Sequence, residues 1–207
     1  MKLISARQAW GDAYHHSQKS ILEAAAQRAE LELKKDRIRA KRIEKGRQVM
    51  PANETRWGVD HSIARCEHML AAGLVQSAIA TLAPPLQHLG HFLYSPIATG
   101  IDQNRAHSYL YFSTDLPKMH KSRQETAYWL ALAALYSWRG MVSGQEEWWP
   151  AKIAGFLSDY GGVKIYVSQW ARDWADTWEA FLSKVNELDA KALAPVANVV
   201  QKQREAA

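Results

Sequence analysis

Apolar residues recur with helical periodicity along most of the chain, and they are densest between residues 126 and 138. That stretch, Thr-Ala-Tyr-Trp-Leu-Ala-Leu-Ala-Ala-Leu-Tyr-Ser-Trp, places apolar side chains on nearly every face of a helix, which is typical of a helix surrounded by other elements. Ser122 with Glu125 matches a capping box, and Gly144 is a suitable end. Because the run of 13 residues is shorter than the roughly 18–20 that cross a bilayer, we expect residues 122–142 to form a buried central helix.

Shorter apolar patterns on both sides of this helix predict further helices. Pro150 fits the first position of a helix, and Gly161-Gly162 fits its end. Residues 163–167, Val-Lys-Ile-Tyr-Val, are rich in β-branched side chains, so they form either a short strand or the start of the next helix. Strands and helices do not alternate, so the fold class is mostly α. The expected helices cover residues 5–16, 60–72, 74–82, 85–94, 102–112, 151–160 and 168–189.

The N-terminal quarter has a pattern of its own. Between residues 20 and 47 the chain contains no proline and only one glycine, Gly46, which predicts a long basic helix. Positions spaced alternately by four and three residues form a weak heptad seam over about three heptads. The seam consists of Leu22, Ala26, Ala29, Leu33, Asp36, Ala40 and Ile43.

Proline and glycine positions divide the chain into three expected parts. Gly46 and Pro51 end the basic helix, and a polar linker follows. We therefore predict a basic helical arm at residues 1–50, a compact all-α domain at residues 57–194 around the central helix, and a frayed tail at residues 195–207.

Charge is distributed unevenly between these parts. Residues 1–50 hold 12 Lys and Arg against 6 Asp and Glu, whereas residues 51–207 hold 14 against 15. Such asymmetry predicts a polyanionic partner. Three interpretations of the arm stay open: a self-associating coiled coil with a basic outer surface, a lone basic helix that orders on a phosphate backbone, or a solvated helix with neither role. The candidate phosphate contacts are Lys34, Lys35, Arg37, Arg39, Lys41, Arg42, Lys45 and Arg47.

A second candidate surface lies between Ile153 and Arg172. A helix-turn-helix unit needs apolar residues and a small alanine in its first helix, a glycine at the turn, and apolar residues on the second helix that pack back. Ile153, Ala154, Leu157, Gly161, Val167 and Trp170 match those roles, with three extra residues before the turn. The alternative is that Trp170, Trp174 and Trp178 form a core stripe and that residues 161–167 are a connector. The residues that the second element would expose are Lys164, Tyr166, Gln169 and Arg172, with Arg123 and Lys152 nearby. Of these, Lys164, Gln169 and Arg172 are the expected nucleic-acid contacts.

The stretches Leu22–Ile43 and Ile153–Arg172, under a quarter of the chain, resemble parts of phage-encoded DNA-handling proteins. These are late-gene regulators of the antiterminator kind and small terminase subunits, which pair a helix-turn-helix with an oligomerising helical segment. The resemblance implies a transcription regulator that binds nucleic acid, DNA rather than RNA. The same resemblance leaves an alternative, which is a homo-oligomeric assembly or packaging protein that uses the N-terminal heptads.

The motifs of common enzymes and metal sites are missing. Cys66 is the sole cysteine, and the histidines lack the spacing of a zinc site. Neither a phosphate-binding glycine loop nor a Gly-x-Ser-x-Gly motif occurs. We therefore expect no catalytic residue, no metal and no cofactor. Because no apolar signal region precedes the first charges and no segment is long enough to span a membrane, we expect a cytoplasmic protein, in the bacterial host if it is phage-encoded.

Overall fold

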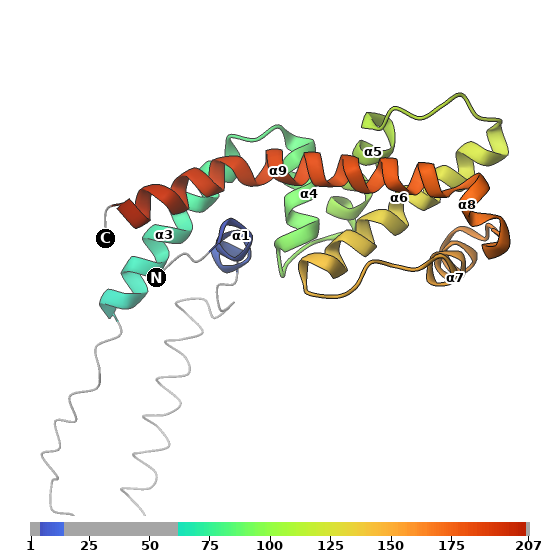
Figure 1. Ribbon diagram of the computed structural model, residues 1–207. Helices are drawn as coiled ribbons and strands as arrows, with labels where there is room; N and C mark the ends of the chain where they lie inside the picture. Colours follow the sequence, from blue (N-terminus) through green and yellow to red (C-terminus); the bar gives the residue numbers. More distant parts are fainter. Residues whose placement is uncertain (1–4, 15–61, 206–207) are drawn as a thin grey trace, which may run out of the picture.

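The computed structural model describes residues 5–14 and 62–205, and this part of the chain is helical without any strand (Figure 1). The mostly α fold class is therefore confirmed. In order, the helices are α1 Ala6–Tyr14, α3 Ser62–Ala80, α4 Pro84–Tyr94, α5 Gly100–Ser113, α6 Lys121–Val142, α7 Pro150–Gly161, a short 3-10 helix η1 Val167–Gln169, α8 Trp170–Asp173 and α9 Ala175–Glu205. Within these ranges, no helix has both the length and the apolar character that a membrane crossing requires.

Helix α9 is the longest of the described elements, with 31 residues, and at 1.5 Å per residue it extends for about 46 Å. Figure 1 shows it running along the whole described body, with α1 and α3 beside its C-terminal half and α6, α7 and α8 near its beginning. Elements far apart in the sequence are thus held together by one continuous helix.

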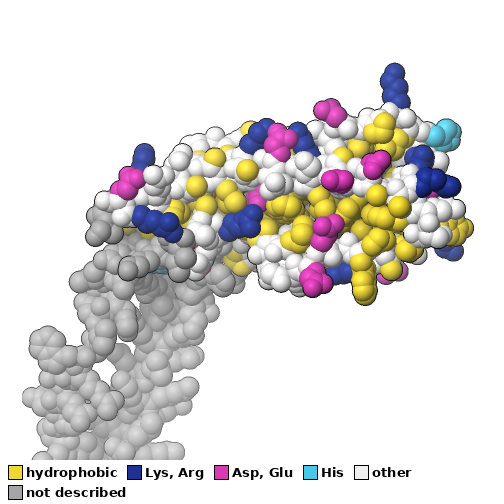
Figure 2. Space-filling view, in the orientation of Figure 1, with side chains coloured by type: hydrophobic (Ala, Val, Ile, Leu, Met, Phe, Trp, Pro, Cys, Tyr) yellow, Lys and Arg dark blue, Asp and Glu magenta, His cyan; other side chains and the backbone are white. Residues whose placement is uncertain are grey.

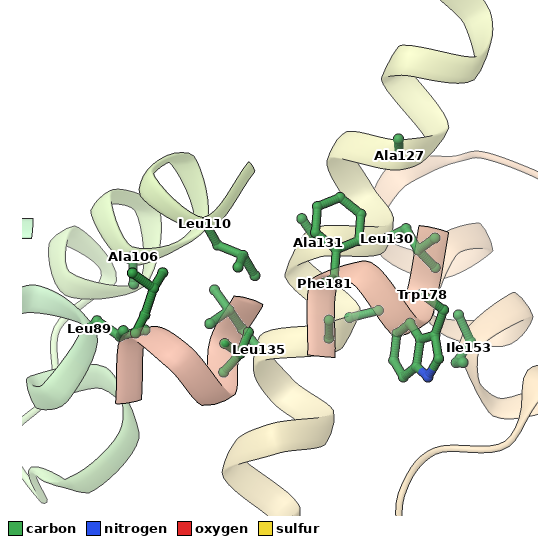
Figure 3. Packing of buried hydrophobic residues seen from close by; sticks show 14 of the residues in the cluster. Leu89, Ala106, Leu110, Ala127, Leu130, Ala131, Leu135, Ile153, Trp178 and Phe181 are labelled. Atoms are coloured by element: carbon green, nitrogen blue, oxygen red, sulfur yellow. The ribbon is translucent and has the colours of Figure 1, made fainter. Parts of the chain in front are cut away.

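A first hydrophobic core surrounds α6. Leu130, Ala131 and Leu135 of α6 are fully buried, and Trp178 and Phe181 project from α9 toward α6 and α7 (Figure 3). The prediction of a buried central helix at residues 122–142 is therefore confirmed. Its start is different: the helix begins at Lys121 after His120, and no side chain caps it. Ser122 lies inside the first turn, where its backbone oxygen accepts a hydrogen bond from the Thr126 hydroxyl at 3.1 Å.

A second core lies where α1 and α3 pack on the C-terminal half of α9. Trp10 of α1 is completely buried there together with Val75 and Ile79 of α3. The assignment of all residues 1–50 to an arm is therefore wrong for α1, which is part of the globular body. An alanine-rich face with one tryptophan is enough to dock this helix, because Ala9 and Ala13 allow close approach on either side of Trp10.

The predicted frayed tail at residues 195–207 is also wrong as far as residue 205. Helix α9 continues through Pro195 to Glu205, and Val196 and Val200 are buried in the second core. Ala192, Val196 and Val200 recur every four residues, so one face of the helix packs continuously. That packing offsets the hydrogen bond that proline removes from a helix interior.

Glycine and proline mark the ends of α7 as expected. Pro150 occupies its first turn, and Gly162 follows it in the left-handed conformation, with φ of 63°. Helix α5 differs in detail, because Thr99 is its N-cap and Asp102 completes a reciprocal capping box from the third helical position. The heptad seam from Leu22 to Ile43 and the linker after Pro51 lie outside the described residues.

Candidate nucleic-acid interface

The segment between α7 and α9 is an exposed connector. The Val163 amide donates to the Leu157 carbonyl at 3.1 Å, which closes the end of α7 behind the left-handed Gly162. Residues 163–166 are neither helical nor paired in a strand. Val163 and Ile165 are half-buried, whereas the alternate residues Lys164 and Tyr166 are exposed. The sequence left two alternatives for residues 163–167, a strand or the start of a helix. Neither forms over residues 163–166, and a helical turn begins only at Val167, the first residue of η1.

This connector does not provide the second helix of a helix-turn-helix. The residues that follow form the three-residue η1 and then α8, which has only four residues and ends where Trp174 adopts φ of −135°. A recognition helix must present several side chains on one continuous face of the major groove. The predicted helix-turn-helix at Ile153–Arg172 is therefore wrong, because β-branched residues after the Gly161-Gly162 pair extend the chain where the motif needs a helical turn.

The tryptophans of this region belong mainly to the first core, as the alternative interpretation predicted. Trp174 and Trp178 are buried, and the rings of Trp170 and Trp178 meet edge to face at 6.0 Å between centroids. Trp170 and Trp178 come from α8 and α9, so the stripe is divided between two helices and is not the face of one.

The three predicted contact residues of this segment are all at the surface. Lys164, Gln169 and Arg172 are exposed, and the Arg172 side chain keeps 73% of its accessible surface. Lys164 has no ion-pair partner among the residues that the structure describes. We call the exposed stretch of residues 164–172 the outer strip; its contact residues stand on the connector, η1 and α8 and do not share a helix.

Asp173 holds two guanidinium groups at one edge of this strip. Arg172 donates from Nε and Nη2 to the two carboxylate oxygens, both at 3.0 Å. Arg123 of α6 reaches the same carboxylate at 3.4 Å and lies over the Trp174 ring, 5.3 Å from its centroid. The hydrogen bond from Arg172 lowers the pKa of Asp173, so this carboxylate stays ionised. Two cations share one anion, which leaves the edge positive.

Lys152 is not part of this strip. It lies in the first turn of α7, and its ammonium group stands over the Trp148 ring at 4.4 Å from the centroid. This arrangement is a cation–π interaction between the ammonium group and the indole ring. We therefore leave Lys152 out of the candidate interface.

A buried polar cluster joins the two cores. Asp189 of α9 has 1% of its surface exposed and accepts hydrogen bonds from Arg7 of α1 at 3.0 Å, from the Tyr94 hydroxyl of α4, and from Trp138 Nε1 of α6 at 3.4 Å. Burial and the hydrogen bond to Asp189 raise the pKa of Tyr94 well above its usual value. Buried carboxylates need such partners, and this one fastens four helices together. Nothing in the sequence distinguished Asp189 from the exposed acidic residues of the same helix.

A second polar cluster connects α4 and α5. Arg105 can only donate, so His88 Nε2 accepts its guanidinium N–H at 3.0 Å and His88 Nδ1 donates to Asp102 at 2.7 Å. Thr99 also donates to Asp102, at 2.7 Å. Because both ring nitrogens of His88 are engaged, the cluster lacks a base that faces a nucleophile. Within the described residues, no group of three or more His, Cys, Asp or Glu side chains is placed to hold a metal ion.

Comparison with protein-family models, with curated proteins and with solved structures gave no match.

Proposed function

We propose that this protein binds nucleic acid, and that a basic segment at residues 34–47 supplies most of the attraction to phosphate. The observation that carries the proposal is the distribution of charge. The residues that the structure describes contain 14 Lys and Arg and 14 Asp and Glu, so the body is neutral and the net charge of +5 belongs to the rest of the chain. The cations of the segment are Lys34, Lys35, Arg37, Arg39, Lys41, Arg42, Lys45 and Arg47.

The geometry of the body supports this assignment, because many of its cations face its own acids. Lys184 and Lys191 both bind Glu187, at 2.9 and 2.6 Å. Arg7 binds the buried Asp189. Figure 2 shows the same mixture on one face of the molecule, where Lys and Arg side chains are interspersed with Asp and Glu. A neutral, mixed surface attracts a polyanion weakly, so strong binding requires the basic segment.

The biological role that we propose is that of a phage-type transcription regulator of the antiterminator kind, in the cytoplasm of the bacterial host. Its contact with nucleic acid does not run through a helix-turn-helix at Ile153–Arg172, since α8 is too short to act as a recognition helix. We therefore assign binding to phosphate attraction by the basic segment, with Lys164, Gln169 and Arg172 as a second, smaller contact surface.

The proposal is tested by the salt dependence of binding to a labelled duplex of about 20 base pairs. With six to ten phosphate contacts, affinity falls by about 10³–10⁵-fold between about 50 and 200 mM salt. A full-length variant with the eight cations changed to glutamine is expected to lose most of this slope. The control changes Lys184 and Lys191 to glutamine, which removes two cations from the body. Binding that is indifferent to salt, or unaffected by the eight substitutions, rules the proposal out.

The alternative function, a homo-oligomeric assembly or packaging protein, is favoured by one surface of α3. Met69, Leu70 and Leu74 are large apolar side chains, all exposed. Such a face is typical of a surface that another chain covers. Light scattering of the full chain, beside a variant with Leu22 and Leu33 changed to aspartate, tests whether the heptads build an oligomer. A fragment that starts at residue 51 is unsuitable for this purpose, because it lacks α1 and with it part of the second core.

A further inference from the structure

Tyr166 is the most exposed ring of the connector between α7 and α9. Its surface is 69% accessible, and among the described residues its side chain makes no ring contact and no hydrogen bond, while its backbone carbonyl accepts from the Gln169 amide at 3.0 Å. Tyrosine rings normally bury much of their surface and dominate the energetics of the places where they pack. An exposed ring on an ordered connector is therefore available to a planar ligand.

The neighbours of Tyr166 place charge and amide groups around the ring. Lys164 stands two residues earlier in the same extended stretch, so both side chains point to the same outer side. Val167 beside it is also exposed. Gln169 and Arg172 continue the strip on η1 and α8. Aromatic, cationic and amide side chains thus alternate along one short surface.

Tyr160 gives this surface a second ring at the end of α7. It is 62% exposed and stacks on Phe156, with centroids 4.5 Å apart and ring planes at 23°. Phe156 is held in turn by Trp148 and Tyr136, at 5.3 and 5.5 Å between centroids. The inner face of Tyr160 is therefore fixed and its outer side is open. Helix α7 contacts η1, and Tyr160 and Tyr166 stand close to the two ends of the connector that joins them.

We propose that the strip from Tyr160 to Arg172 binds single-stranded nucleic acid, with unpaired bases stacked on Tyr166 and Tyr160. This inference rests on the proposed function and specifies the form of nucleic acid that this surface selects. Stacking on aromatic rings needs bases whose faces are free, and it tolerates any base sequence. A duplex hides those faces, and the body has no recognition helix at this strip to read a groove.

Local charge is consistent with a nucleic-acid strand but does not select between its forms. Lys164, Arg123 and Arg172 are opposed by Asp173, which binds both arginines, and by Asp159 next to Tyr160. Cations exceed acids by one, enough to favour a phosphate backbone and too little to hold it alone. The rings therefore determine the preference for the single strand, and Lys164 and Arg172 orient the backbone.

The test compares two labelled probes on the full chain at one low salt concentration: oligo(dT) of about 20 nucleotides and a duplex of equal length. Anisotropy is expected to show tighter binding of the single strand. Changing Tyr166 to alanine is expected to weaken single-strand binding about 5- to 100-fold, the effect of losing one stacked base. Duplex binding, which depends on the basic segment, is expected to change less than about twofold.

Two variants serve as controls. Tyr166→Phe keeps the ring and is expected to keep the affinity. Trp149→Ala removes an equally exposed ring at the opposite end of α7, and is expected to leave both affinities unchanged. Circular dichroism of each variant checks that the fold is intact.

The outcomes separate the two proposals. If neither probe binds at low salt, the proposed function fails and this inference with it. If both probes bind and Tyr166→Ala weakens them equally or not at all, the protein still binds nucleic acid, but the stacking surface is refuted. A loss confined to the single strand, restored by Tyr166→Phe, establishes the inference.

Discussion

At the scale of single residues, Asp189 links four helices, a role that its position in the sequence does not indicate. It lies on a helix with other acids, of which Glu187 is exposed and pairs with two lysines, whereas Asp189 is buried among Arg7, Tyr94 and Trp138. Acidic residues look alike in a sequence, and only the packing of four helices makes one of them an internal anchor.

Changing Asp189 to alanine is expected to destabilise the protein by about 3 kcal/mol, because removing one partner of a buried ion pair leaves the remaining groups unsatisfied. The control is Glu187→Ala, two residues earlier, which removes an exposed carboxylate paired with Lys184 and Lys191 and is expected to cost much less. Urea unfolding monitored by tryptophan fluorescence measures both. Equal losses for the two variants would show that Asp189 does not fasten the helices.

Two histidines are expected to make stability depend on pH. Burial lowers the pKa of His91, whose ring meets Tyr14 at 4.8 Å, and of His107, which is buried against the Tyr128 carbonyl. Their folded pKa values lie below the value of 6.5 that applies when they are unfolded. The unfolded chain therefore binds more protons, and stability that is complete above pH 6.5 is lost as the pH falls through this range.

The free energy of unfolding is expected to decrease by at most about 1.4 kcal/mol per pH unit for each of these histidines. Urea unfolding between pH 7.5 and pH 5 measures the slope. His91→Gln is expected to reduce it. A slope that is the same in this variant and in the unchanged protein contradicts the assignment.

At the scale of elements, the docking of α1 includes one very close approach to α4. The Trp10 ring occupies the space beside Gly90 of α4, where an added Cβ would come within 2.3 Å of the ring. Gly90→Ala is therefore expected to destabilise the protein by about 1–3 kcal/mol through overpacking, although alanine favours a helix. Gly155→Ala in α7, where a Cβ meets no atom within 4 Å, is expected to stabilise it by up to about 1 kcal/mol.

Thermal unfolding of the two alanine variants gives the comparison. If both shift the midpoint upward, helix propensity alone determines the effect, and Trp10 does not need the space beside Gly90.

The sequence allowed some elements to be predicted and not others, for physical reasons. The apolar run that became α6 is apolar on nearly every face, so its burial follows from composition alone. Lys164, Gln169 and Arg172 were expected at the surface, and they are exposed. The second helix on which they were expected does not form, because the turn at Gly162 and the β-branched residues after it extend the chain. The continuation of α9 through Pro195 depends on packing against α1 and α3, which a local pattern does not contain.

At the scale of the whole molecule, α9 joins two hydrophobic cores into one body. Its first half lies in the core around α6, and its second half in the core with α1 and α3. Leu86 and Tyr94 of α4 contact both cores, and Asp189 lies between them. Since a helix propagates cooperatively once formed, disruption of one core is transmitted along α9 to the other.

The two cores are therefore expected to unfold together. Leu135→Ala in the first core and Ile79→Ala in the second remove similar apolar volume from buried sites, and each is expected to cost about 2–5 kcal/mol. Both are expected to lower the midpoint of a single calorimetric transition, with equal calorimetric and van't Hoff enthalpies. Two separate transitions in Ile79→Ala would mean that α1, α3 and the end of α9 unfold independently. In that case Asp189 and Tyr94 would link two units that are each stable alone, and α9 would be a tether between them.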